Sequence, residues 1–295
     1  MRVISRPRGL RHQFTCETIT GMRIAYHAEP GAYSESAALL FNRAAESVAC
    51  RSFDEVFAVV ERGQATHGIV PIENTIRGSI HRNYDLLFQH DLPVVGEVQL
   101  QITHSLLGLP GTALSDVRRL YSDPQTLAEC EAFVRGLGAV EVVAVYDAAA
   151  SARAVKESQG GGAAIASDRE GHEFGLEILK ANVQDTDDNL TRFLIVTRGS
   201  SSTAPPEADK TTIVFSLPSQ PGALFKALSV FALRDIDLTK LESRPIHGRP
   251  FEYMFYADLA VSRHDMRCAR ALVHLAEFAS WVRTLGSYRA WKPTS

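Results

Sequence analysis

The chain has 295 residues, of which 45% are hydrophobic and 22% charged, and its formal net charge is −3. This length is sufficient for two domains and a well-buried core, while the small net charge gives no reason to expect a nucleic acid or a membrane surface as partner. No apolar run approaches the roughly 18 residues that a membrane span needs. The four cysteines are scattered, which favours a reducing compartment, and we expect the cytoplasm.

The first 21 residues differ in character from the rest. They carry four arginines and no acidic residue before Glu17. They lack the apolar core of a secretory signal, and an organelle transit peptide is usually longer and richer in serine. We expect a disordered tail, or an over-long start before a native Met22, because Met22 directly precedes a convincing strand.

From Met22 onward, strands and helices alternate. The expected elements are a strand at 23–27, a helix capped by Ser34, a helix capped by Ser52, a buried strand at 68–72, a helix capped by Ser79 and a long strand at 93–103. A second unit follows, with strands at 120–121, 140–145 and 163–166 and helices at 124–133 and 148–157. This alternation predicts mainly parallel sheets, and two such units predict two lobes with a cleft between them.

The stretch from Gln184 to Val196 combines a polar run with a buried strand. It contains three acids and then passes through Thr191-Arg192-Phe193 into an apolar run. A hydroxyl and a guanidinium therefore lie where a loop enters a sheet, a position that often faces a cleft. Residues 199–209, rich in serine and proline, are expected to be a linker. The remaining chain follows the order β-α-β-β-α-β of a ferredoxin-like domain.

Polar clusters end several of these strands. Glu73-Asn74-Thr75, Gly78-Ser79 and Ser122-Asp123-Pro124-Gln125 could bind a ligand, or could serve only as turns and helix caps. Thr191 is a very weak acid, so its plausible role is a hydrogen-bond donor to a leaving oxygen; alternatively, it simply begins a strand. The sequence lacks the spacing of a zinc site, a nucleophile elbow or a dinucleotide fingerprint. We therefore expect a cleft for a small polar acid, with no metal and no cofactor.

Together these segments resemble the prephenate dehydratase family with a C-terminal ACT regulatory domain. The resemblance covers residues 22–291 and is carried, in the family's order, by PGAYSE, GIVPIENT, GSIHRNYDLL, GEVQL, YSDPQ, NLTRF, PGALFKAL and LESRP. GAYSE and GSIHRNYDLL look closest to the branch that includes plant arogenate dehydratases. The resemblance implies an α/β catalytic domain of two lobes, similar to periplasmic-binding-protein type II, over residues 22–198. An α+β ferredoxin-like ACT domain would then occupy residues 210–295.

The family implies one reaction, in which prephenate loses its ring hydroxyl and a carboxylate to give phenylpyruvate, carbon dioxide and water. Thr191 matches the family's essential threonine, as hydrogen-bond donor or acid to the leaving hydroxyl. The implied substrate-binding residues are Ser34, Glu73, Asn74, Thr75, Ser79, Ser122, Gln125, Arg192 and Phe193. Asp123 and Glu129 depart from the family, which often has histidine and glutamine there. An added acid would repel a dianionic substrate unless it points away or meets an ammonium group, as arogenate would provide. We expect prephenate, with arogenate as the alternative.

For the C-terminal domain the resemblance implies feedback by phenylalanine, and a homodimer or homotetramer formed through these domains. A helix start can hold a carboxylate, and Glu242 can pair with an ammonium. The implied effector residues are Gly222, Ala223, Leu224, Glu242, Ser243, Arg244 and Pro245. Two other classes stay open: a non-catalytic binding protein, and an amino-acid sensor whose catalytic half is inactive.

Overall fold

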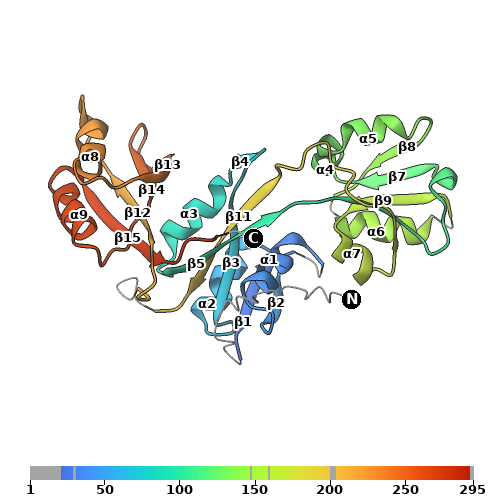
Figure 1. The fold of residues 1–295 in the computed structure, drawn as a ribbon, viewed down its shortest axis with the longest axis horizontal. Helices are drawn as coiled ribbons and strands as arrows, with labels where there is room; N and C mark the ends of the chain where they lie inside the picture. The colour runs from blue at the N-terminus through green and yellow to red at the C-terminus, as the bar shows by residue number, and fades with distance from the viewer. Residues whose placement is uncertain (1–20, 29–30, 147, 159, 200–203, 293–295) are drawn as a thin grey trace, which may run out of the picture.

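The computed structural model describes residues 21–28, 31–146, 148–158, 160–199 and 204–292. Apart from Gly21, the predicted tail lies outside the described residues, as do positions 200–203 of the predicted linker. The described residues form three sheets, arranged as two lobes and a C-terminal domain (Figure 1). Among them, no helix combines the length and apolarity that crossing a membrane requires.

The first lobe is a mixed sheet with helices on it. It contains β1 (Arg23–His27), α1 (Tyr33–Phe41), β2 (Glu46–Cys50), α2 (Phe53–Glu61), β3 (His67–Asn74), β4 (Gly78–Ser79), α3 (His81–Gln89), β5 (Val94–Gln101) and, much later in the chain, β11 (Leu190–Thr197). The strand order is β2-β1-β3-β11-β5, with β4 paired to β3. β11 therefore lies between β3 and β5 and runs antiparallel to both.

The second lobe has the strand order β10-β6-β9-β7-β8. Its elements are β6 (Ser105–Gly108), the 3₁₀ helix Leu114–Asp116, β7 (Arg119–Ser122), α4 (Pro124–Glu129), α5 (Glu131–Gly136), β8 (Glu141–Ala144), α6 (Ala148–Glu157), β9 (Gly162–Ala166), α7 (Asp168–Glu173) and β10 (Glu177–Lys180). The chain passes between the lobes twice, after β5 and before β11 (Figure 1).

These two crossings explain where the expected topology is wrong. The expectation of mainly parallel sheets fails for β5, β6, β10 and β11, which pair antiparallel because the chain enters and leaves the second lobe along them. Ser52 caps α2 as expected, accepting from Glu55 N at 3.2 Å. Ser34 does not cap a helix, since α1 begins at Tyr33. Ser79 ends β4 instead of capping α3.

The C-terminal domain has the expected β-α-β-β-α-β order. It consists of β12 (Lys210–Ser216), α8 (Ala223–Ala232), β13 (Leu238–Pro245), β14 (Tyr253–Leu259), α9 (Met266–Phe278) and β15 (Trp281–Tyr288). The antiparallel sheet has the order β13-β14-β12-β15. One face packs against α8 and α9 through Ile213, Ala227, Phe231 and Leu275.

The other face of this sheet packs on the first lobe. Met254, Tyr256 and Leu285 share one buried core with Tyr84 and Leu87 of α3, and the Tyr256 hydroxyl donates to the Tyr84 carbonyl at 2.7 Å. A side chain at Gly286 would overlap the Val94 carbonyl, so β15 lies against the start of β5 as closely as two backbones allow. The C-terminal domain and the first lobe therefore form one packed body.

Candidate active site

The candidate site begins with two neighbouring pairs on β3 and β11. Thr191 lies opposite Asn74, and Arg192 lies opposite Glu73. Because successive residues of a strand point to opposite faces, the four predicted residues separate into two pairs. Asn74 and Thr191 point to one side of the sheet, while Glu73 and Arg192 point toward the C-terminal domain.

The orientation of the Thr191 hydroxyl follows from the Asn74 amide. Asn74 Oδ1 accepts from the backbone nitrogens of Ile76 and Arg77, both at 2.9 Å. Its Nδ2 is thereby turned toward Thr191 Oγ1, to which it donates at 2.9 Å. The Thr191 oxygen accepts this bond, and within the described ranges its hydroxyl makes no other. The Thr191 proton can therefore be donated to a ligand.

The hydrogen-bond chain continues to the second lobe. Asn74 Nδ2 also donates to Asn189 Oδ1 at 2.7 Å, and Asn189 Nδ2 donates to Glu129 Oε2 at 2.8 Å. The predictions above do not include Asn189. It precedes Thr191 by two positions, the spacing at which residues of one strand share a face, so this signal could have identified it.

Glu129 joins three parts of the chain. Its Oε2 lies 2.9 Å from His104 Nε2 on the crossing segment after β5, and its Oε1 accepts from Arg77 Nε at 2.8 Å. Burial would raise the pKa of Glu129, but the hydrogen bonds from His104 and Arg77 outweigh it and lower that pKa below its ordinary value. The carboxylate is therefore ionised at neutral pH, and it offsets the positive charge of Arg77 across the two lobes.

This shifted pKa makes stability depend on pH. A carboxylate with a lowered folded-state pKa contributes stability above its unfolded value, and loses that contribution as the pH falls through the folded value. We expect the difference in free energy of unfolding between wild type and Glu129→Gln to be largest near neutral pH. It should shrink as the pH falls below 4.5, the ordinary pKa of glutamate. Urea titrations at about pH 7 and about pH 3 measure this, and an unchanged difference contradicts it.

Other contacts between the lobes surround this chain. The Tyr33 hydroxyl donates to the Thr103 carbonyl at 2.5 Å and lies 2.9 Å from His104 Nδ1. Ser167 Oγ donates to the Gly31 carbonyl at 3.2 Å. Gly31 has a φ of +94°, and a side chain there would press on the backbone of Glu170. Glycine at this position therefore allows the backbone of the first lobe to approach α7 of the second lobe closely.

The other predicted substrate residues have different surroundings. The Thr75 hydroxyl donates to the Asp188 carbonyl at 2.5 Å and holds the loop before β11. Phe193 is in the core of the first lobe, and buried Ser122 donates to the Ile165 carbonyl. Gln125 is exposed on α4 and Ser34 is half-buried on α1.

The two acids that depart from the family pattern, Asp123 and Glu129, both have hydrogen-bond partners within the protein. Asp123 accepts from the backbone nitrogens of Gln125 and Thr126, so it caps α4. Glu129 meets the Arg77 guanidinium. The sequence predictions did not include Arg77, Glu129, His104 or Tyr33 as site residues, although Arg77 precedes GSIHRNYDLL and Glu129 was identified as a departure from the family.

The predicted effector residues also divide into two groups. Ala223 and Leu224, following Gly222 at the start of α8, line a cavity of about 320 Å³ together with residues 217–221 and Tyr253. Glu242 and Arg244 lie on β13 and face the first lobe, where Ser79 Oγ donates to Glu242 at 2.5 Å and Arg244 pairs with Asp85 at 2.8 Å. Ser243 and Pro245 are exposed on the opposite face of β13.

Comparison with known proteins supports this architecture. A family model described as prephenate dehydratase matches residues 24–201, and an ACT domain model matches 211–263. The chain is 46% identical over 277 residues to "Arogenate dehydratase/prephenate dehydratase 2, chloroplastic" from Arabidopsis thaliana, covering 90% of this chain and 72% of that protein. It is 45% identical to "Arogenate dehydratase 2" from Petunia hybrida, covering 90% of this chain and 71% of that protein.

Two solved structures are similar over most of their length. Prephenate dehydratase from Arthrobacter aurescens, in complex with L-Phe, has a TM-score of 0.81 and 31% identity, covering 91% of this chain and 90% of that one. GqqA, described as a novel type of quorum quenching acylase, has a TM-score of 0.85 and 34% identity, covering 91% of this chain and 98% of that one.

The fold and the matching family model define a two-lobed carbon–oxygen lyase with an appended ACT domain. The chain belongs to the prephenate dehydratase family, whose curated members here are named arogenate dehydratase or arogenate/prephenate dehydratase. The predicted fold class, reaction class and effector domain are thereby confirmed.

The expected location is wrong. The Arabidopsis relatives at 46%, 44% and 43% identity are named chloroplastic, which contradicts the cytoplasm. Three described cysteines, Cys50, Cys130 and Cys268, are free and buried. Scattered cysteines indicate a reducing compartment, but they do not distinguish one reducing compartment from another.

Proposed function

We propose that this enzyme catalyses the decarboxylative dehydration of prephenate, with Thr191 as the donor to the departing hydroxyl. The bond from the ring to its carboxylate breaks and its electron pair enters the ring. The ring carbon–oxygen bond breaks as the ring becomes aromatic, and the hydroxide leaves toward the Thr191 proton. A positioned donor lowers the cost of charge building on that oxygen.

The observation that carries this proposal is the orientation of Thr191. Asn74 donates to its oxygen, so the proton is free to point toward a substrate. Asn74 is in turn fixed by the backbone of the turn after β3, and Asn189 by Glu129 of the other lobe. The donor is therefore oriented before the substrate arrives, as electrostatic stabilisation of a leaving group requires.

The same geometry argues against an acylase reaction like that described for GqqA. A hydroxyl nucleophile needs a neighbouring base to accept its proton. Among the described residues the Thr191 hydroxyl is hydrogen-bonded only to the Asn74 amide nitrogen, which cannot accept a proton. We therefore do not propose acyl transfer at Thr191.

The Glu129–Arg77 pair bears on the choice of substrate. Arg77 would attract a substrate carboxylate, but Glu129 cancels its charge. Arogenate carries an ammonium where prephenate carries a keto oxygen, so the Glu129 carboxylate favours arogenate relative to prephenate. This observation, with the names of the plant relatives, supports arogenate as a second substrate.

A comparison of both substrates tests this proposal. We expect wild type to convert prephenate. We expect Glu129→Gln to raise the ratio of kcat/KM for prephenate over arogenate by about tenfold, or about 1.4 kcal/mol, since the ammonium of arogenate loses an opposite charge. Asp123→Asn is the matched control, because it also removes a carboxylate from the α4 region while an asparagine can still cap the helix. No turnover of either substrate would overturn the proposed function. Equal ratios in the two variants would overturn the role of Glu129.

Regulation by phenylalanine is proposed for the C-terminal domain. An ACT domain is present, and the Arthrobacter relative was solved with L-Phe. The cavity beside Ala223 and Leu224 at the start of α8 offers backbone N–H groups for a carboxylate and apolar walls for a ring. We further propose a homodimer or homotetramer through these domains, the domain boundaries 22–198 and 210–295, and a plastid location in keeping with the chloroplastic relatives.

A further inference from the structure

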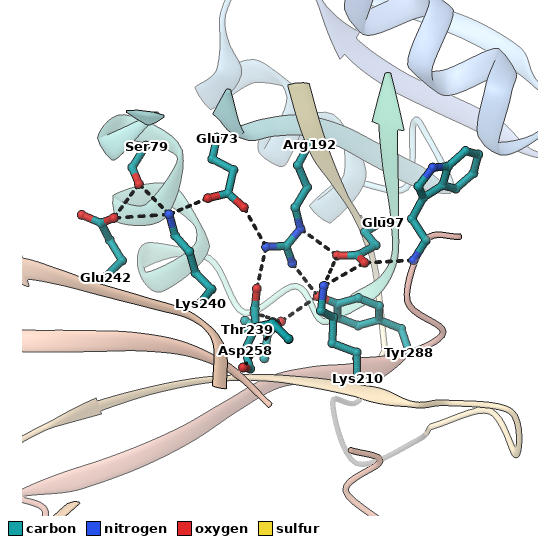
Figure 2. A network of polar contacts seen from close by, with 12 residues as sticks. Glu73, Ser79, Glu97, Arg192, Lys210, Thr239, Lys240, Glu242, Asp258 and Tyr288 are labelled. Carbon is teal, nitrogen blue, oxygen red and sulfur yellow. Dashed lines mark hydrogen bonds and ion pairs between the residues drawn. The ribbon is translucent and has the colours of Figure 1, made fainter. Parts of the chain in front are cut away.

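A cluster of buried charged residues lies on the face of β11 away from Thr191, and the proposed reaction does not use it. Arg192, which is 7% exposed, lies between the first lobe and the C-terminal domain (Figure 2). Its Nε donates to Glu97 at 2.7 Å and one terminal nitrogen donates to Glu73 at 3.2 Å, both within the first lobe. The guanidinium also pairs with Asp258 of β14 at 2.5 Å and donates to the Tyr288 hydroxyl of β15 at 3.2 Å.

This environment fixes the guanidinium in place. Burial disfavours the charge of Arg192, yet Asp258, Tyr288 and Glu97 raise its pKa above the ordinary value. The group is therefore a permanent cation, and its planar fork holds its partners in one geometry. With four partners already bonded, Arg192 points away from the face that carries Thr191 and Asn74, and it is not available to a substrate there.

The acids that bind Arg192 from the first lobe are also held by the C-terminal domain. Lys240 of β13 lies 2.5 Å from Glu73, and Lys210 of β12 lies 2.9 Å from Glu97 (Figure 2). Lys240 also donates to Ser79 at 2.9 Å. Three C-terminal strands thus hold the Arg192 cluster through charged side chains.

The cluster is joined to the candidate active site through the backbone. Arg192 follows Thr191 directly, and Glu73 precedes Asn74 directly, while each residue lies opposite its counterpart on the neighbouring strand. A movement of β14 against the first lobe that displaces Arg192 and Glu73 must therefore also displace the Thr191–Asn74 pair. Hydrogen-bonded geometry is sensitive to such movements, since a misplacement of 1 Å can cost about 100-fold in rate.

We propose that Arg192 is a positioning residue, not a substrate ligand, and that it couples docking of the C-terminal domain to the orientation of Thr191. The inference rests on the proposed role of Thr191 as donor. Ligand binding to the C-terminal domain changes activity because it alters the ion pairs that Asp258 forms with Arg192 and that Lys240 forms with Glu73. Ser79 and Glu73, predicted to bind substrate, belong to this coupling instead.

The test compares two ways of weakening the same domain contact. Asp258→Asn removes one charge that holds Arg192, while the asparagine can still accept from Thr212. Arg283→Met removes bonds to the Phe88 and His90 carbonyls, at 3.0 and 2.9 Å, which also join the domains but do not touch Arg192. Tyr288→Phe is the second variant. It removes only one hydroxyl from the cluster, so it tests the same contact if Asp258→Asn fails to fold.

We expect Asp258→Asn to lower kcat for prephenate at least about tenfold while KM changes less than about threefold, and to abolish the response of kcat to phenylalanine. Arg283→Met should keep kcat within about twofold of wild type and retain the response. Unchanged kcat and phenylalanine response in Asp258→Asn and Tyr288→Phe would overturn the inference. Equal losses in Arg283→Met would also overturn it, by showing that docking in general is responsible. An inactive wild type would instead refute the proposed function, so the two failures are distinguishable.

Discussion

Replacing Thr191 by valine is expected to lower kcat for prephenate by at least about 100-fold, because removing one oriented donor from a developing oxyanion has effects of this size. Valine keeps the shape of the side chain, and Asn74 Nδ2 retains Asn189 as acceptor. Steady-state kinetics measure the loss, which should fall mainly on kcat because the donor acts in the transition state.

Thr191→Ser is the matched control, since it keeps the hydroxyl and loses only a methyl group. We expect it to retain most of the activity, and both variants to unfold within about 1–2 kcal/mol of wild type. A valine variant with a kcat near that of wild type would contradict the role of Thr191. So would an inactive serine variant that is fully folded.

Replacing Gly286 by valine is expected to destabilise the protein by about 3 kcal/mol or more, because a side chain there overlaps the Val94 carbonyl and backbone cannot move aside as a flexible side chain can. The overlap lies where β15 contacts β5, so the contact between the C-terminal domain and the first lobe must open. Chemical denaturation followed by tryptophan fluorescence measures the change, since Trp281 is on β15.

Gly136→Ala provides the comparison for this variant. Gly136 ends α5, has an ordinary φ, and has open space where a side chain would begin. Alanine there should change stability by less than about 1 kcal/mol, and in the stabilising direction. If Gly286→Val were as stable as Gly136→Ala, the close contact between the two domains would be refuted.

Much of the architecture follows from local pattern. The helix at 148–157 was predicted with the bounds it has, and Ser52 caps α2 because a strand ends just before a strongly amphipathic segment. The topology of the crossings was not accessible in this way. Whether β11 pairs with β3 or with a strand of the second lobe depends on contacts between segments more than 100 residues apart, and no local periodicity records them.

The candidate site was predictable to the same limited degree. Thr191 and Asn74 were correctly placed at strand ends, and the structure brings them together. Arg192 and Glu73 are assigned to the substrate by the family resemblance, although strand alternation turns them to the other face. Both faces of β11 are buried. Which of them meets the C-terminal domain depends on docking, and the sequence of β11 alone does not carry that information.

The core shared by the first lobe and the C-terminal domain has a consequence for modularity. Met254, Tyr256 and Leu285 bury α3 residues such as Leu87, so cutting the chain within 199–209 would leave apolar surface on both fragments. The two parts should melt in one cooperative transition, despite their separate sheets. A lineage that loses feedback control therefore cannot simply delete this domain. It must keep it as scaffold, or replace the apolar face of α3 with polar residues.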